Sequence, residues 1–208
     1  KTALIFPGQG SQNVGMGHDF YSNFQSSRYI YDQLDKIMGK SLTNLIFKGE
    51  ESELAMTENS QPSIMATSIA IIAALKESGK IDEHSFHCVA GHSLGEYSAL
   101  VANKSLNFSD SVELLKIRSK AMQESMPVGS GGMAAIIGGT EEGIAATISD
   151  ISSEGKIFIA NDNAVGQVVI SGEIKAIDYI VENSKKKRKK KVIKLSVSAP
   201  FHCEFMTK

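Results

Sequence analysis

The segment Gly91-His92-Ser93-Leu94-Gly95 constrains the fold of this chain more than any other. An apolar run, Phe86 to Ala90, precedes it, and a helix-forming run, Glu96 to Ala102, follows it. A Gly-x-Ser-x-Gly segment between a strand and a helix is typical of a nucleophile elbow, a sharp turn that exposes the serine hydroxyl and needs small neighbours. The start of the helix also favours negative charge beside the serine. The same pattern fits a glycine-flanked turn whose serine only caps the helix.

The composition suits one compact globular unit or two small ones. The chain has 208 residues, of which 42% are hydrophobic and 22% are charged, and its net charge is −1. This balance gives no general attraction to nucleic acid or to a membrane surface. No apolar stretch is long enough to span a bilayer, and the apolar start, Ala3 to Phe6, is too short for a signal peptide.

The two cysteines, Cys88 and Cys203, are too few for a disulfide framework, so we expect a reducing, cytoplasmic location. Neither cysteine has a second sulfur or paired histidines at ligand spacing, so we expect no metal site. Cys203 is expected to pack rather than to react.

The predicted elements indicate an α/β fold in two parts. The first part begins with a buried strand over 2–6 and contains the elbow strand and its helix. Its other predicted helices, taken from apolar spacing and start signals, cover 19–38, 60 to about 79, and 109 to about 126.

A Pro-, Gly- and Ser-containing segment at 127–132 predicts a boundary. The elements expected beyond it follow the order βαββαβ, which is the ferredoxin-like motif: strand 133–137, helix 141–151, strands 156–160 and 167–171, helix 174–184 and strand 192–197. We therefore expect a small subdomain over 127–195, inserted into a large subdomain formed by 1–126 and 196–208.

A catalytic serine needs a base to take its proton. Of the five histidines, His202 is the best candidate, because it follows a predicted strand in a loop, where active-site residues are common. His92 is adjacent to Ser93, and successive side chains at a turn diverge. The remaining three are expected at the surface or in packing positions: His18, His84 and His87.

A serine that attacks a carbonyl group also needs two backbone N–H groups that stabilise the oxyanion of the tetrahedral intermediate. Leu94 N–H, directly after the serine, is one candidate, and the open turn Gly8-Gln9-Gly10 is expected to supply the other. This turn is not a dinucleotide-binding fingerprint, because Asn13 stands where a third glycine is needed.

Arg118 is predicted to point inward, because it lies between Leu115 and Met122 on the apolar stripe of its helix. An inward arginine is costly unless a carboxylate or a phosphate pairs with it. Two partners remain open: an internal carboxylate such as Glu96, or the carboxylate of a substrate.

Six segments occur in one order along the chain: Phe6-Pro-Gly-Gln-Gly-Ser-Gln12, Gln61-Pro62, Gly91 to Ser98, Arg118 with Met122-Gln-Glu124, Gly166 to Gly172, and Ser198-Ala-Pro-Phe-His-Cys203. Together they resemble the malonyl-CoA:acyl carrier protein transacylases of bacterial fatty-acid synthesis, over nearly the whole chain. Chains of that family continue well past Lys208, so this chain resembles an incomplete member.

The resemblance implies a large α/β-hydrolase-like subdomain interrupted by a small ferredoxin-like one. It implies that the chain transfers a malonyl group from malonyl-CoA to the phosphopantetheine thiol of acyl carrier protein, as a monomer, with no metal or bound redox cofactor. The implied site residues are the nucleophile Ser93, the base His202, the oxyanion-hole amides of Gln9 and Leu94, Arg118 for the malonyl carboxylate, Gln61 and His92 lining the pocket, and Phe201 crowding out a branched acyl group.

Two other functions are weighed against this one. A serine esterase would hydrolyse malonyl-CoA without a carrier protein. Esterases of the elbow type have the acid of their triad between the serine and the histidine in sequence, and no acid between Ser93 and His202 can be assigned to the site from the sequence. An inactive module that binds acyl carrier protein would form no acyl-serine.

Seven consecutive cationic residues follow the last predicted helix, 174–184: Lys185, Lys186, Lys187, Arg188, Lys189, Lys190 and Lys191. Positive charge suits a helix C-terminus, so a solvated helix end is one explanation. The other is a docking patch for the acidic acyl carrier protein. Nucleic acid is a weaker candidate, because no aromatic residue is interleaved with the run.

Overall fold

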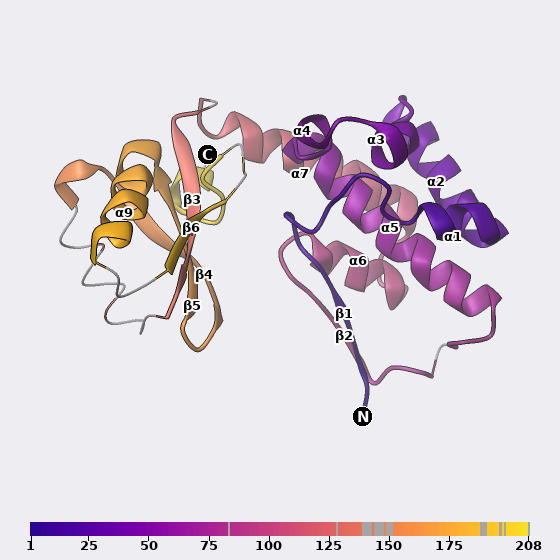
Figure 1. Ribbon diagram of the computed structural model, residues 1–208. Coiled ribbons are helices and arrows are strands. Elements are labelled where there is room, and N and C mark those ends of the chain that lie inside the picture. Colours follow the sequence, from indigo (N-terminus) through magenta and orange to yellow (C-terminus); the bar gives the residue numbers. More distant parts are fainter. Residues whose placement is uncertain are drawn as a thin grey trace. The chain divides into compact units, whose positions relative to one another are not determined.

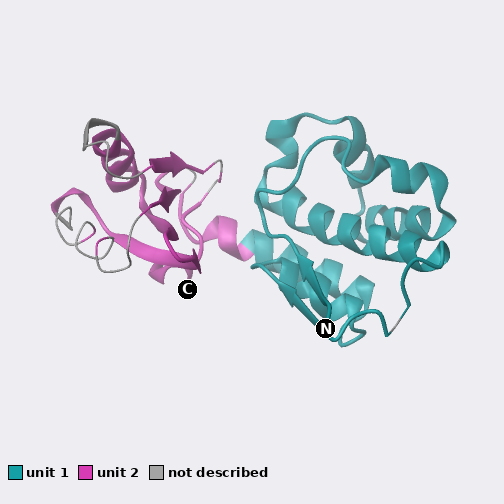
Figure 2. Ribbon diagram, turned by 60° about the horizontal axis from the view of Figure 1, so that its bottom comes forward, with its two compact units in different colours: residues 1–120 teal, residues 121–208 magenta. Residues whose placement is uncertain are grey.

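The computed structural model divides the chain into two compact units, Lys1–Lys120 and Ala121–Lys208, shown in different colours in Figure 2. It describes residues 1–82, 84–127, 129–138, 143, 148, 152–187, 191–195, 197 and 199–207, with the backbone alone at 185–187. Among these residues no helix has the length and apolar character needed to cross a bilayer.

The first unit contains a two-stranded parallel sheet and a group of helices (Figure 1). Strand β1 pairs with β2 in a register that sets Phe6 opposite Gly91. The elements of this unit are β1 (Ala3–Phe6), α1 (His18–Asn23), α2 (Gln25–Met38), α3 (Leu42–Lys48), α4 (Glu51–Leu54), α5 (Thr57–Glu77), β2 (Cys88–Gly91), α6 (Gly95–Ala102) and α7 (Phe108–Glu124), whose last residues belong to the second unit.

Helix α5 is the centre of the first unit. It contacts α1, α2, α3, α4 and α6, and nearly every position from Thr57 to Ala74 is buried. This confirms the expectation from its sequence, which is apolar almost all round. The core cluster of the unit joins α5 to β1 through Phe6 and to α7 through Leu115.

Two of the predicted helices are wrong in their bounds. The segment 19–38 is two helices, because Phe24 is extended (φ −127°, ψ 125°). The carboxylate of Glu77, at the end of α5, accepts a hydrogen bond of 2.8 Å from the Ser26 backbone N–H and so caps the start of α2. Helix α5 begins at Thr57 rather than at Ser60, which leaves Pro62 inside the helix. Short helices α3 and α4 were not predicted.

The second unit contains a four-stranded sheet in the order β4-β5-β3-β6, with antiparallel neighbours throughout. Helix α9 contacts β3, β5 and β6. The elements are β3 (Gly131–Ile137), η1 (Ser152–Glu154), β4 (Ile157–Ala164), β5 (Gln167–Glu173), α9 (Ile174–Lys187), β6 (Lys191–Lys194) and η2 (Glu204–Met206). The predicted helix 141–151 lies almost entirely outside the described residues.

Alternation along the strands gives this sheet two apolar faces. Ile136 and Ile170 pack against Ile177 of α9 on one face. On the other face Met133 and Val169 pack against Phe201. The described residues after β6 therefore pack on the sheet of the second unit, and the predicted division into 1–126 with 196–208 and 127–195 stays a prediction.

Tyr31 predicts how the stability of the first unit depends on pH. Its side chain is fully buried and donates a hydrogen bond of 3.0 Å to Thr67 Oγ1. Burial raises the pKa of Tyr31 to about 12, whereas an unfolded tyrosine has a pKa of about 10. The unfolded state therefore loses this proton first, so stability is intact below about pH 10 and falls by up to about 3 kcal/mol as the pH rises toward 12.

Denaturant titrations of the full-length protein at about pH 9 and about pH 11 test this expectation. The free energy of unfolding should fall more steeply with pH in the wild type than in Tyr31→Phe, which has no phenol to ionise. Equal pH dependence in the two proteins would contradict it.

Candidate active site

Ser93 stands on the turn that joins β2 to α6, as the sequence predicts. Its φ angle is 54°, in the left-handed region that non-glycine residues seldom adopt. The turn is held from both sides: the His92 backbone N–H donates to Phe6 O at 3.0 Å, and the Gly95 backbone N–H donates to His92 O at 2.9 Å. This is the strained strand–turn–helix geometry of a nucleophile elbow.

Three glycines let this turn lie against its neighbours. A Cβ at Gly91 would come within 2.0 Å of Gly95 O, and a Cβ at Gly95 would come within 2.5 Å of Phe6 O. A Cβ at Gly8, on the turn after β1, would come within 2.7 Å of His92 O. Because these contacts are to backbone atoms that cannot swing aside, only glycine fits, and the turn after β1 is held against the elbow.

Arg118, on α7, donates hydrogen bonds to two of the predicted site residues. Its Nη2 lies 3.1 Å from Ser93 Oγ, and its Nη1 lies 2.6 Å from Gln61 Oε1. The guanidinium carbon also lies 5.9 Å from the centre of the Tyr97 ring, within cation–π range. The inward orientation predicted from the helical stripe is confirmed.

The charge of Arg118 is not neutralised by a carboxylate among the described residues. Both of its hydrogen-bond acceptors are neutral, and no ion pair to the described Glu96 forms. Burial lowers the pKa of Arg118, and the charges of Tyr97 and Glu96 partly oppose that effect. A half-buried guanidinium whose hydrogen-bond acceptors are neutral has the chemistry to bind an anion.

The two predicted oxyanion-hole donors lie on the two turns that Gly8 brings together. Leu94 is fully buried at the start of α6, and Gln9 follows Gly8 on the turn after β1. To the part of the chain that the structure describes, neither backbone N–H donates a hydrogen bond. Two N–H groups without an acceptor among the described residues are what an oxyanion hole requires.

The remaining predicted site residues lie in different places. Gln61 is fully buried on α5, and His92 is exposed on the elbow turn. His202 belongs to the second unit, is exposed and has a φ angle of 57°. Phe201 is 4% exposed and lies in the core of that unit. The pairing of Ser93 with His202, which are in separate units, stays a prediction.

Sequence reasoning missed Thr57, which lies four residues before Gln61 on α5. The Gln9 side-chain amide donates to Thr57 Oγ1 at 3.2 Å, and the Gln61 amide donates to Gln9 Oε1 at 3.5 Å. The i, i+4 spacing would have placed Thr57 beside Gln61 if the helix had been predicted to start early enough.

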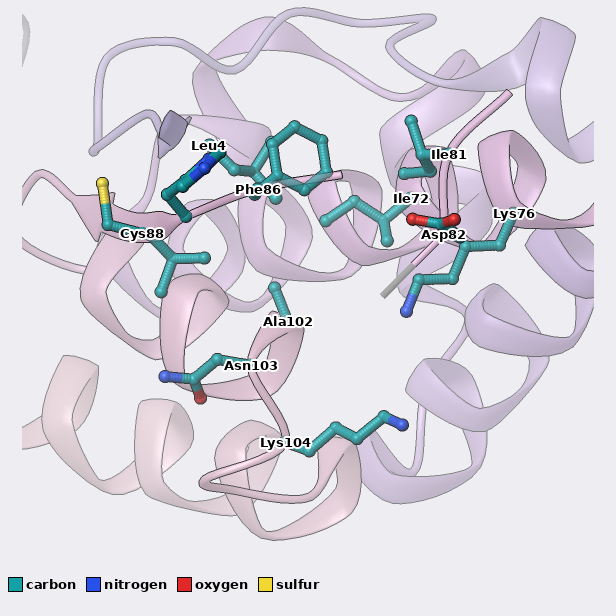
Figure 3. A pocket seen from close by; sticks show the side chains of 12 residues that line it. Leu4, Ile72, Lys76, Ile81, Asp82, Phe86, Cys88, Ala102, Asn103 and Lys104 are labelled. Carbon is teal, nitrogen blue, oxygen red and sulfur yellow. The ribbon is translucent and has the colours of Figure 1, made fainter. Parts of the chain in front are cut away.

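A cavity of about 510 Å³ in the first unit is separate from these residues. Figure 3 shows its lining side chains, which include Phe86, Cys88, Lys76 and Lys104. The cavity lies toward the beginning of β2, whereas Ser93 follows its carboxyl end. In parallel sheets ligand sites form at the carboxyl ends of strands, so this cavity is not the site around Ser93.

The basic run 185–191 begins in the last residues of α9 and ends at the first residue of β6. Only Lys191 of the run has a described side chain, and it is exposed at the start of β6. Over the described ranges no group of three or more His, Cys, Asp or Glu side chains gathers as a metal site would.

The chain is similar to known acyl transferases over almost its whole length. The family model described as acyl transferase domain matches residues 3–208. The malonyl CoA-acyl carrier protein transacylase of Bacillus subtilis is 42% identical over 207 residues, which are 99% of this chain and 64% of that protein. The chain thus spans less than two thirds of that relative's length.

Two solved structures show the same fold. The acyl-carrier-protein S-malonyltransferase of Bartonella henselae has a TM-score of 0.90 and 42% identity, with 99% of this chain and 66% of that chain covered. A malonyl-transacylase in complex with its type II PKS acyl-carrier protein has a TM-score of 0.89 and 37% identity, with 98% and 65% covered. With the family model matched over almost every residue, the chain belongs to the acyl transferase domain family.

Proposed function

We propose that the protein transfers a malonyl group from malonyl-CoA to the phosphopantetheine thiol of acyl carrier protein, through an ester on Ser93. One observation carries this proposal: the Arg118 guanidinium, which has no described carboxylate partner, lies 3.1 Å from Ser93 Oγ. An anionic group on the acyl chain would therefore be bound directly beside the nucleophile. The names of the relatives, malonyl CoA-acyl carrier protein transacylase and acyl-carrier-protein S-malonyltransferase, support the same substrates.

The spacing favours a short diacid. In a malonyl ester, the carboxylate carbon lies two C–C bonds, about 2.5 Å, from the carbonyl carbon attached to Ser93. A guanidinium already within hydrogen-bond distance of Oγ can reach such a carboxylate with both of its NH2 groups. A neutral acyl group would leave the arginine buried without an anion, which is costly.

The first half-reaction forms the malonyl-serine. His202 takes the Ser93 hydroxyl proton, and Oγ attacks the thioester carbonyl carbon. The backbone N–H groups of Gln9 and Leu94 stabilise the resulting oxyanion. The C–S bond then breaks, and the leaving CoA thiolate receives from His202 the proton that came from Ser93.

The second half-reaction reverses these steps with a new thiol. His202 deprotonates the phosphopantetheine thiol of the carrier protein, and the thiol sulfur attacks the ester carbonyl carbon. The ester C–O bond then breaks, and Ser93 Oγ receives the proton from His202. Neither half-reaction changes an oxidation state, and we propose no bound cofactor. The similar malonyl-transacylase solved in complex with its acyl-carrier protein supports this partner.

We infer that the two units belong to an α/β-hydrolase-like large subdomain and a ferredoxin-like small subdomain over 127–195. The strand order β4-β5-β3-β6 supports the second of these. His92 and Gln61 would line the acyl pocket, and Phe201 would limit branching at the acyl carbon next to the carbonyl. We also propose a monomer in the cytoplasm, in keeping with the absence of a disulfide framework in the sequence.

We propose that the basic run 185–191 attracts the acidic carrier protein. Its seven consecutive cations stand out from a chain whose net charge is −1, and clustered charge of one sign steers an oppositely charged partner.

Replacing Ser93 by Ala should abolish the malonyl adduct, because no other group is proposed to carry the acyl chain. Intact mass measurement of the full-length protein mixed with malonyl-CoA should show one malonyl adduct in the wild type and none in Ser93→Ala. The adduct should disappear on addition of holo acyl carrier protein. Absence of an adduct in a folded wild-type sample would refute the transfer, and loss of the adduct to water alone would indicate a hydrolase.

Replacing Arg118 by Ala should slow malonyl transfer selectively. Losing a charged partner beside a half-buried carboxylate costs roughly 2–5 kcal/mol, or about 30- to 4,000-fold in kcat/KM, while transfer from acetyl-CoA should change little or rise. Lys116→Ala is the matched control, because Lys116 is exposed on the same helix and should leave both substrates unaffected. An equal loss with malonyl-CoA and acetyl-CoA would contradict the carboxylate role.

Changing Lys185, Lys186 and Lys187 to Gln should raise the KM for acyl carrier protein several-fold at low salt, and the difference should vanish at high salt because ions screen the attraction. The rate of malonyl-serine formation serves as the internal control. The matched variant changes three exposed lysines of the first unit to Gln: Lys36, Lys48 and Lys80. An unchanged KM in the first variant, or an equal rise in the second, would argue against docking at the run.

A further inference from the structure

A continuous line of side-chain hydrogen bonds leads from the guanidinium of Arg118 to the turn after β1. Arg118 Nη1 donates to Gln61 Oε1 at 2.6 Å, Gln61 Nε2 donates to Gln9 Oε1 at 3.5 Å, and Gln9 Nε2 donates to Thr57 Oγ1 at 3.2 Å. The other NH2 group of the guanidinium, Nη2, donates to Ser93 Oγ. The nucleophile, the anion-binding arginine and the turn after β1 are thus in one network.

The direction of every bond in this line follows from the arginine. A guanidinium can only donate, so Gln61 must turn its oxygen toward Arg118 and its NH2 toward Gln9. Gln9 must then present its oxygen to Gln61 and its NH2 to Thr57. The hydroxyl of Thr57 accepts the hydrogen bond from Gln9, and a carbon side chain of the same shape cannot replace it.

Helix α5 carries two of the four residues joined by these hydrogen bonds, Gln61 and Thr57. Gln61 is fully buried and Thr57 is 1% exposed, and their spacing of four residues places them on one face of the helix. Because α5 is the buried centre of its unit, these two side chains are rigid supports. Gln9 belongs instead to a turn and is half-buried, so its side chain ties a surface turn to the core.

The backbone of the same residue, Gln9, is the proposed second donor of the oxyanion hole. Gly8 fixes this turn from one side, by its close approach to His92. The bond to Thr57 fixes it from the other side. A donor must point at the position where the oxyanion forms, and a small misplacement lowers the rate without weakening substrate binding.

We propose that Thr57 and the side chain of Gln9 are positioning residues, which orient the Gln9 backbone N–H for the oxyanion and link it to the acyl-carboxylate site at Arg118. This inference rests on the proposed acyl transfer to Ser93. Neither side chain touches the reacting atoms: both act through the direction of one backbone N–H.

Thr57→Val tests the hydroxyl, because valine keeps the shape and removes the acceptor. In single-turnover measurements of malonyl-serine formation by the full-length protein, we expect the maximal rate to fall about ten-fold, less than the hundred-fold or more of losing a donor outright. The concentration of malonyl-CoA for half-maximal rate should stay within about two-fold. Thr57→Ser, which keeps the hydroxyl, should restore most of the rate.

Transfer from acetyl-CoA distinguishes the proposed role of Thr57 at the oxyanion from the proposed role of Arg118 at the acyl carboxylate. An oxyanion forms with every thioester, so Thr57→Val should slow transfer from acetyl-CoA by the same factor as transfer from malonyl-CoA. Gln61→Met, which removes the support of Arg118, should slow malonyl transfer more than acetyl transfer. A purely structural role of Thr57 would instead lower Tm and the amount of active protein, with an unchanged rate per active site.

A double-mutant cycle isolates the bond between the two proposed residues. Gln9→Met keeps the backbone N–H and removes the side-chain amide, so Thr57→Val should have little further effect on the rate in that background. Additive effects, or a wild-type maximal rate in Thr57→Val, would overturn the inference. Absence of any malonyl adduct in the wild type would instead refute the proposed function, so the two failures are distinguishable.

Discussion

The parallel pairing of β1 with β2 is the constraint on which the site depends. It sets Phe6 opposite Gly91, so the turns that follow the two strands emerge side by side. Glycine at positions 8, 91 and 95 then allows backbone to lie on backbone at distances that any side chain would prevent. One turn carries Ser93 and Leu94 and the other carries Gln9. The site is therefore assembled by the sheet and not by the loops alone.

The other side chains of the site come from α5 and α7, which share a core cluster with Phe6 of β1. Buried α5 supplies Thr57 and Gln61, and α7 supplies Arg118. Their polar side chains satisfy one another, so the unit tolerates a half-buried guanidinium that forms no ion pair with a described carboxylate. In the proposed function, the cost of keeping that cation unneutralised would favour an anionic acyl group over a neutral one.

Local sequence predicted much of the first unit because its signals are short-range. The strand before Pro7, the elbow and the buried character of α5 follow from residue order and apolar spacing. The break at Phe24 was missed because the cap of α2 is Glu77, which is 51 residues from Ser26. Pro62 favours a first-turn position and so predicts a later start for α5 than Thr57, where the helix begins.

The sequence by itself determined the chemical parts: a serine on an elbow, an inward arginine, two turns rich in glycine and a motif order matched by the acyl transferase domain family. Only the tertiary structure decided which neutral side chains support them. Arg118 bonds to Gln61 across 57 residues and to Ser93 across 25, and Gln9 bonds to Thr57 across 48. Contacts at such separations leave no periodic pattern in sequence, because they join α5 and α7 to turns that lie far away in the chain.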